Sequence, residues 1–71
     1  MITEYTRVKT LVEKDGHPAG TIGVVVSLYS SGPACEVEVF EVLDETGTFY
    51  PVDVVTYLFD ELEEIELPPE K

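Results

Sequence analysis

The sequence predicts a small all-β fold made of a single domain. Residues 34–42 alternate between apolar and acidic side chains, which is typical of a strand with one buried and one wet face. Clusters of Gly, Pro, Asp and Ser at 14–20 and 30–33 divide the chain into segments of strand length. At 71 residues and 44% hydrophobic, the chain has enough apolar residues for one modest core.

The first half predicts three strands. Residues 6–13 are rich in β-forming side chains, with Val8, Thr10 and Val12 on one face. The Lys14–Gly20 stretch predicts an excursion with at least one positive-φ residue, rather than a two-residue hairpin. Residues 21–29 are apolar on both faces near the middle, as expected for a strand at the centre of a small closed sheet. The alternating strand at 34–42 follows a turn.

A hairpin connects the third strand to the fourth. Residues 43–48 form its loop, with Gly47 in the left-handed region of backbone space. Residues 49–55 give the fourth strand, in which Pro51 lacks an amide hydrogen and therefore needs an edge position or a late strand start. Phe40 interrupts the polar outer face of the third strand, and we expect it at the barrel rim or beside a cross-strand aromatic such as Tyr50.

The chain then turns once and closes. Residues 56–62 are too few for an independent helix and predict a single 3₁₀ or α turn. A short fifth strand at 63–67 follows, with Ile65 and Leu67 facing inward, and the barrel at about 6–67 leaves a tail at 68–71. This element order predicts a small five-stranded SH3-like barrel, because closing the sheet removes its edges and buries one common core.

The same residues resemble a known family. The run Gly20-Thr21-Ile22-Gly23-Val24-Val25-Val26, the later Glu36-Val37-Glu38-Val39 and the closing 62–65 stretch are similar to small bacterial and cyanobacterial SH3-like domains of unknown function. The resemblance covers about residues 7–66 and brings no catalytic motif. Relatives often lie beside toxin-like genes, so the resemblance implies an immunity or antitoxin role. The acidic hairpin at 43–48 is longer than in that family.

Charge is distributed unevenly along the chain. Residues 1–35 carry three acids and three bases and sum to zero, whereas residues 36–71 carry twelve acids and one base and sum to −11. A field of this sign repels nucleic acid and anionic membranes and attracts basic protein surfaces. The alternative is that the negative charge serves only to keep the protein soluble. The absence of a signal-peptide pattern at the N-terminus and the single cysteine favour a cytoplasmic location.

Two residues whose side chains could act in catalysis or metal binding are expected to be structural. His17 is the only histidine and lies in a Gly/Pro-rich loop, so we expect an exposed side chain rather than a metal ligand or a base. Cys35 shares a strand face with Val37 and Val39 and is expected to be a small buried apolar residue. No metal or cofactor is therefore expected, and an enzyme ranks last among the functions considered.

The leading hypothesis is a non-enzymatic acidic module that binds a basic protein surface, as an immunity-type, antitoxin-like or phage-type inhibitor would. Aromatic anchors at Tyr57 and Phe59 would supply apolar contact. The alternative is a small structural or adaptor subunit that docks through an aromatic patch or by strand addition. The candidate partner-binding acids are Glu36, Glu38, Asp44, Glu45, Asp60, Glu61 and Glu64.

Overall fold

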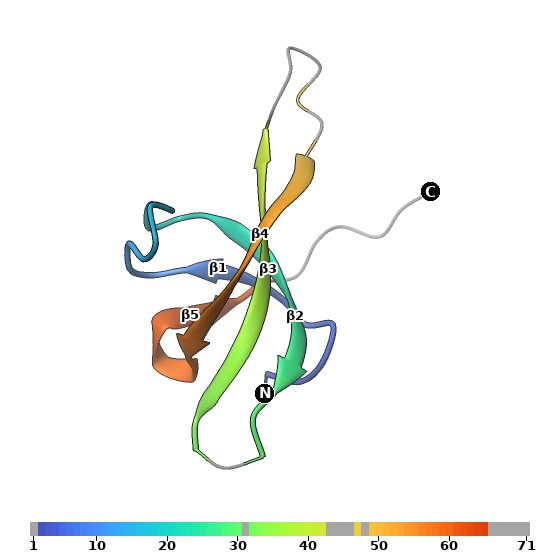
Figure 1. Cartoon of the computed structure of the whole chain (residues 1–71), viewed down its shortest axis with the longest axis vertical. Helices are drawn as coiled ribbons and strands as arrows, with labels where there is room; N and C mark the ends of the chain where they lie inside the picture. Colours follow the sequence, from blue (N-terminus) through green and yellow to red (C-terminus); the bar gives the residue numbers. More distant parts are fainter. Residues whose placement is uncertain (1, 31, 43–46, 48, 66–71) are drawn as a thin grey trace.

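A computed structural model of the chain describes residues 2–30, 32–42, 47 and 49–65. These residues form five antiparallel strands in one sheet, of order β4-β3-β2-β1-β5, and one 3₁₀ turn, η1 (Figure 1). The all-β prediction is confirmed, as is the 3₁₀ turn before the last strand. The sheet is not closed among the described residues, because β4 and β5 are its two edges. The elements are β1 (Arg7–Thr10), β2 (Ile22–Leu28), β3 (Ala34–Val42), β4 (Phe49–Leu58), η1 (Phe59–Glu61) and β5 (Leu62–Glu64).

One face of the sheet carries the core, and all five strands contribute to it. The alternation predicted for β3 is confirmed, since Cys35, Val37 and Val39 are fully buried while the acids between them are partly exposed. We call this side the inner face and the opposite side the outer face. The buried apolar residues are Val8, Val25, Cys35, Val37, Val39, Val55, Tyr57 and Leu62.

Gly23 allows β2 to approach β3 closely. A Cβ atom built on Gly23 would lie 2.5 Å from Val37 Cγ1 and 2.9 Å from the Glu38 carbonyl oxygen. Both distances are shorter than real Cβ contacts, so a side chain at this position would force the strands apart. The register of β2 against β3 shifts between Val25 and Ser27, which marks a bulge or irregularity shortly after Gly23.

β2 is one residue shorter than predicted at each end, and three other strands also differ from prediction. β1 is shorter than expected and ends at Thr10, while β4 runs on to Leu58 before η1 begins. β5 lies one residue earlier than predicted, so Leu62 is its buried residue and Ile65, just beyond the strand, is partly exposed. Gly47 has the predicted positive φ of 79°. The other predicted features of the 43–48 loop, Leu67 and the 68–71 tail lie outside the described residues.

The Lys14–Gly20 stretch belongs to the predicted excursion between β1 and β2, with positive φ at Asp15, Gly16 and Gly20, and it contains a tight turn that was not predicted. Lys14 and His17 exchange backbone hydrogen bonds, with N–O distances of 3.0 and 2.9 Å, across the central pair Asp15 and Gly16. Both central residues have positive φ, 53° and 83°. Asp-Gly is a favoured pair for such a mirror-image turn, because Gly adopts positive φ without cost and Asp tolerates it.

The close approach at Gly23 makes a prediction for stability. We expect Gly23→Ala to lower the free energy of unfolding by about 1–3 kcal/mol, the usual cost of overpacking. Equilibrium urea unfolding followed by circular dichroism measures it. The matched control is the double variant Gly23→Ala/Val37→Ala, which removes the contacting methyl groups and should lose less than the sum of the two single changes. Strictly additive losses would show that the two residues do not touch.

Candidate functional site

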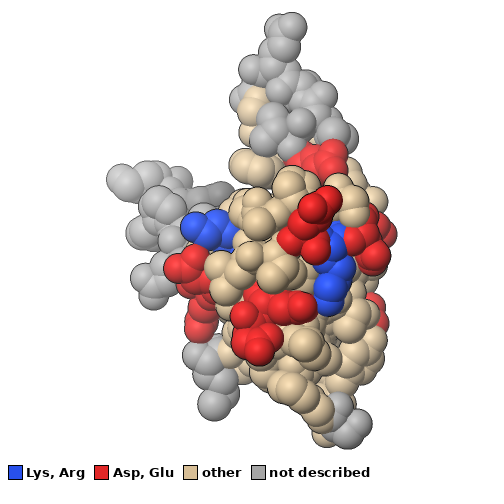
Figure 2. Space-filling model, turned by 90° about the vertical axis from the view of Figure 1, so that its left-hand side faces the viewer, with Lys and Arg blue, Asp and Glu red and all other residues tan. Residues whose placement is uncertain are grey.

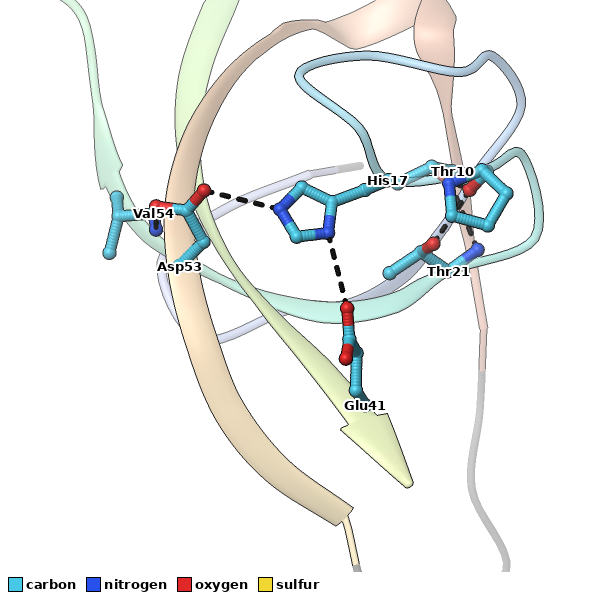
Figure 3. A network of polar contacts seen from close by, with 7 residues as sticks. Thr10, His17, Thr21, Glu41, Asp53 and Val54 are labelled. Atoms are coloured by element: carbon cyan, nitrogen blue, oxygen red, sulfur yellow. Dashed lines mark hydrogen bonds and ion pairs between the residues drawn. The ribbon is translucent and has the colours of Figure 1, made fainter. Parts of the chain in front are cut away.

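The tight turn at 14–17 places two side chains against β4. Residues paired directly across an antiparallel bridge project to the same side, so Lys14 and His17 point together toward the sheet. Lys14 reaches η1 and the last part of β4. His17 reaches Asp53 in the middle of β4 and Glu41 near the end of β3 (Figure 3). The turn therefore covers part of the edge strand that the sheet leaves unpaired.

The predicted exposed position of His17 is wrong, because the residue is only 8% exposed. Its Nε2 atom lies 3.1 Å from Asp53 Oδ2, and its Nδ1 atom lies 3.7 Å from Glu41 Oε2. Nδ1 is buried and has no hydrogen-bond partner among the described residues. The hydrogen bond from His17, followed by the bond from the Val54 amide, lowers the pKa of the Asp53 carboxyl. The imidazole thus lies between two carboxylates at the polar end of the inner face.

The loop that follows His17 is held by a second set of polar contacts. The buried Thr10 hydroxyl donates to the Pro18 carbonyl at 3.2 Å and accepts from the Thr21 amide at 3.1 Å. Thr21 donates its own hydroxyl to the same carbonyl at 2.6 Å (Figure 3). Thr10 is therefore a buried polar residue with its hydrogen bonds satisfied, and it fixes the loop to the end of β1.

Lys14 joins β4 to η1. Its Nζ atom lies 2.8 Å from Glu61 Oε1, 3.1 Å from the Thr56 carbonyl oxygen and 5.1 Å from the centre of the Tyr57 ring. Glu61 Oε1 also accepts a hydrogen bond from the Leu58 amide at 2.9 Å. The Lys14 hydrogen bond, followed by that of Leu58, lowers the pKa of the Glu61 carboxyl. Glu61, predicted as a partner-binding acid, is therefore engaged within the fold.

The prediction that Tyr57 is a surface anchor is wrong. Its side chain is fully buried in the core, where it is among the largest fully buried side chains, and burial raises the pKa of its phenol. β4 continues as a strand to Leu58, so residue 57 falls on the inner face with Val55.

Phe59 is partly exposed, packs against the core and lines a hollow of about 170 Å³ with Pro33, Leu58 and Asp60. Of the two predicted anchors, only Phe59 has exposed surface that a partner could contact.

The predicted acids do not form a single side of the molecule. β3 carries Glu36 and Glu38, and β5 carries Glu64, but β2 and β1 lie between these strands in the sheet. Figure 2 shows acidic side chains spread over one face of the molecule with basic ones among them. Strand pairing also brings the two halves together, because Lys9 of β1 faces Glu63 of β5 with an Nζ–Oε1 distance of 3.5 Å.

The remaining predicted acids have varied positions. Glu36 lies on the outer face of β3, where its carboxylate accepts hydrogen bonds from the hydroxyls of Tyr29 and Thr56. Asp60 is exposed in η1, and Glu64 is exposed in β5. Asp44 and Glu45 lie outside the described residues. Exposed negative charge is thus present over several elements, and the acids are not gathered into one patch.

The outer face has an apolar hollow that the site prediction missed. Its volume is about 380 Å³ and it opens to solvent across β1, β2, β3 and the start of β4. Phe40 and Phe49 lie at one end, which gives Phe40 a different aromatic neighbour from the expected Tyr50. Nearby Val54, the cross-strand partner of Glu38, is 50% exposed. We call this surface the outer-face hollow; it is lined by Arg7, Ile22, Gly23, Val24, Phe40 and Phe49.

Two sequence signals pointed to this hollow. The residues of β2 are apolar on both faces, which means that one apolar row is left over once the other is buried in the core. Phe40 also stands where the alternation of β3 calls for a polar residue. The His17 contacts had no comparable signal, because Glu41 and Asp53 are distant in sequence and the turn that aims His17 was not predicted.

The positions of Cys35 and of the possible metal ligands are as follows. Cys35 is fully buried, and burial, followed by the charge of Glu36, raises the pKa of its thiol, which disfavours the reactive thiolate. Within the described ranges, no group of three or more His, Cys, Asp or Glu residues is placed to hold a metal ion. None of the described residues forms a helix that is long and apolar enough to cross a membrane.

Comparisons with known proteins add no assignment: family models, curated proteins and solved structures gave no match to this chain.

The lowered carboxyl pKa of Asp53 predicts acid sensitivity. A carboxyl whose pKa is lower in the folded than in the unfolded state stabilises the fold above the unfolded value, near pH 4, and this stabilisation is lost as pH falls through the folded value. We therefore expect the free energy of unfolding to fall below about pH 4, and to fall less steeply in Asp53→Asn. Urea titrations at a series of pH values measure both slopes. Glu13→Gln, which neutralises an exposed carboxylate outside the His17 contacts, is the control and should retain the wild-type slope.

The buried phenol of Tyr57 makes a second prediction. Its oxygen is buried without a hydrogen-bond partner among the described residues, so Tyr57→Phe removes an unsatisfied polar atom. We expect an unchanged free energy of unfolding or a gain of up to about 1 kcal/mol. Tyr57→Ala should instead lose about 3–5 kcal/mol because it leaves a cavity. A loss above about 2 kcal/mol in Tyr57→Phe, in the same chemical denaturation measurement, would show that the hydroxyl has a partner.

Proposed function

We propose that the protein is a non-enzymatic protein-binding module of SH3-like architecture that docks its acidic exterior on a basic surface. The strand order supports the architecture, because β1 lies between β2 and β5 and a 3₁₀ turn separates β4 from β5, as in SH3-like barrels. All five strands share one core, which leaves the outer side of the sheet and the loops for contact.

The observation that carries the docking proposal is the surplus of carboxylates over basic side chains. The chain has 15 acids against four lysines and arginines. Two of those bases, Lys9 and Lys14, already form ion pairs with Glu63 and Glu61. The remaining surplus attracts a basic partner and speeds its association, because exposed charges of one sign steer encounters over roughly a Debye length of about 8–10 Å.

The partner we propose is a protein whose basic surface binds nucleic acid. An acidic module that covers such a surface competes with phosphate groups, as an immunity-type, antitoxin-like or phage-type inhibitor in the cytoplasm would. The residues proposed for contact are now reduced, because Glu61 is paired with Lys14 and Tyr57 is buried. Those that remain on described surfaces are Glu36, Glu38, Asp60, Glu64 and Phe59.

A second candidate, a small adaptor subunit, is favoured by the apolar residues of β4. Phe49, Tyr50, Val52 and Val54 are each between 39% and 54% exposed. Strand addition along this half of β4 is disfavoured, because Pro51 has no amide hydrogen to donate and the register against β3 is irregular between Val39 and Phe40. An adaptor of this kind would therefore dock through the exposed side chains of β4 rather than through backbone hydrogen bonds at its edge.

Salt dependence tests the acidic docking proposal. The tagged protein is used to isolate partners from a native lysate, and the dissociation constant of each is measured between about 0.05 M and about 0.5 M salt. We expect it to rise at least about tenfold with salt, and an added nucleic acid to displace the protein from its partner. A variant with Glu36 and Glu64 changed to Gln and Asp60 to Asn, which keeps Glu38 beside the outer-face hollow, should bind less tightly at low salt.

Phe49→Ser is the matched control for this experiment, because Phe49 is exposed and lies outside the proposed acidic contacts. It should bind as the wild type does if charge is what matters. A partner whose affinity is the same at both salt concentrations, and is lost in Phe49→Ser but kept in the amide variant, would overturn the acidic proposal in favour of the adaptor.

A further inference from the structure

The outer-face hollow has charges of opposite sign on its two sides. In the register of the sheet, Arg7 of β1 lies beside Val24 of β2, and Val24 lies beside Glu38 of β3. The next position in the same row is Val54 of β4. An exposed cation and a partly exposed carboxylate thus flank an apolar centre. The further apolar side chains of the hollow are Ile22, Phe40 and Phe49.

This charge arrangement disfavours a basic partner at the hollow. Among the described residues of its lining, Arg7 is the one with a charge, and it would repel the cationic surface proposed above. A fitting occupant needs an apolar surface with a carboxylate close beside it. This chain has such a surface itself, because Glu38 and Val24 are direct cross-strand neighbours.

We propose that the outer-face hollow is the interface between two copies of this chain, related by a two-fold axis near Val24. A two-fold interface makes each contact twice, so that Arg7 of each copy faces the partner's Glu38. The apolar side chains of the two hollows then bury one another at the centre. Pro51 and the irregular register disfavour pairing through the β4 edges, and the apolar hollow favours contact through the sheet faces.

Net charge opposes this association and gives it a recognisable salt dependence. Each copy carries a formal charge of −11, so two copies repel until salt screens them. The apolar centre is insensitive to this screening, so self-association should strengthen as salt is added. Docking on a basic partner should weaken over the same range. The opposite signs make the failure of either proposal distinguishable from failure of the other.

Sedimentation equilibrium of the full chain tests the proposal. At about 0.15 M and about 1 M salt, we expect a species of twice the 7.9 kDa chain mass, with at least about threefold tighter association at the higher salt. Phe49→Ser should weaken association at least about tenfold, since Phe49 supplies exposed apolar surface at the hollow. Asp60→Arg, which changes the charge in η1 away from the hollow, is the control and should associate at least as well as the wild type.

Charge exchange gives the sharper test. Arg7→Glu and Glu38→Arg should each be monomeric, because each places like charges opposite one another twice. A mixture of these two variants should form a heterodimer, since Glu in one copy then faces Arg in the other at both contacts. The double variant Arg7→Glu/Glu38→Arg should recover self-association. A wild-type monomer at both salt concentrations up to about 1 mM protein, or variants that associate as the wild type does, would overturn the proposal.

Discussion

The core of this protein lies on one side of its sheet, and the rest of the structure depends on that constraint. A chain of 71 residues cannot cover both faces of a five-stranded sheet, so the inner face takes the available apolar cover. Gly23 makes the packing close, because its missing side chain lets Val37 and the backbone of β3 approach β2. The consequence is an outer face that retains an apolar row with nothing from the described chain packed over it.

The turn at 14–17 covers part of the edge of β4 that no other described strand pairs with. Lys14 and His17 come from the half of the chain with no net charge, and both reach acidic residues of the other half. The negative charge near the end of the inner face is thereby partly offset where the core meets solvent. This arrangement leaves the exposed acids and the outer-face hollow uncovered, and these are the surfaces that we propose for contact with other molecules.

The alternation of residues 34–42 was enough to predict the strand and its buried side. In a half-buried strand every second side chain faces the core, so the apolar residues of the alternation identify the buried face. The 3₁₀ turn was predictable because residues 56–62 are too few for a helix. Tyr57 was misplaced because that stretch was treated as one element, although β4 runs through Leu58. His17 was misplaced because its burial depends on contacts with Glu41 and Asp53, and long-range contacts of this kind leave no local pattern.

Accessibility of methyl groups to a soluble neutral paramagnetic chelate, measured by NMR on dilute protein at low salt, tests the one-sided core most directly. The account predicts strong relaxation at Ile22, Val24 and Val54 and little at Val25, Val37 and Val39, although Val24 and Val25 are neighbours in the same strand, β2. Equal relaxation of both sets, or the reverse order, would contradict it, because the apolar rows would then not be divided between a buried and an open face.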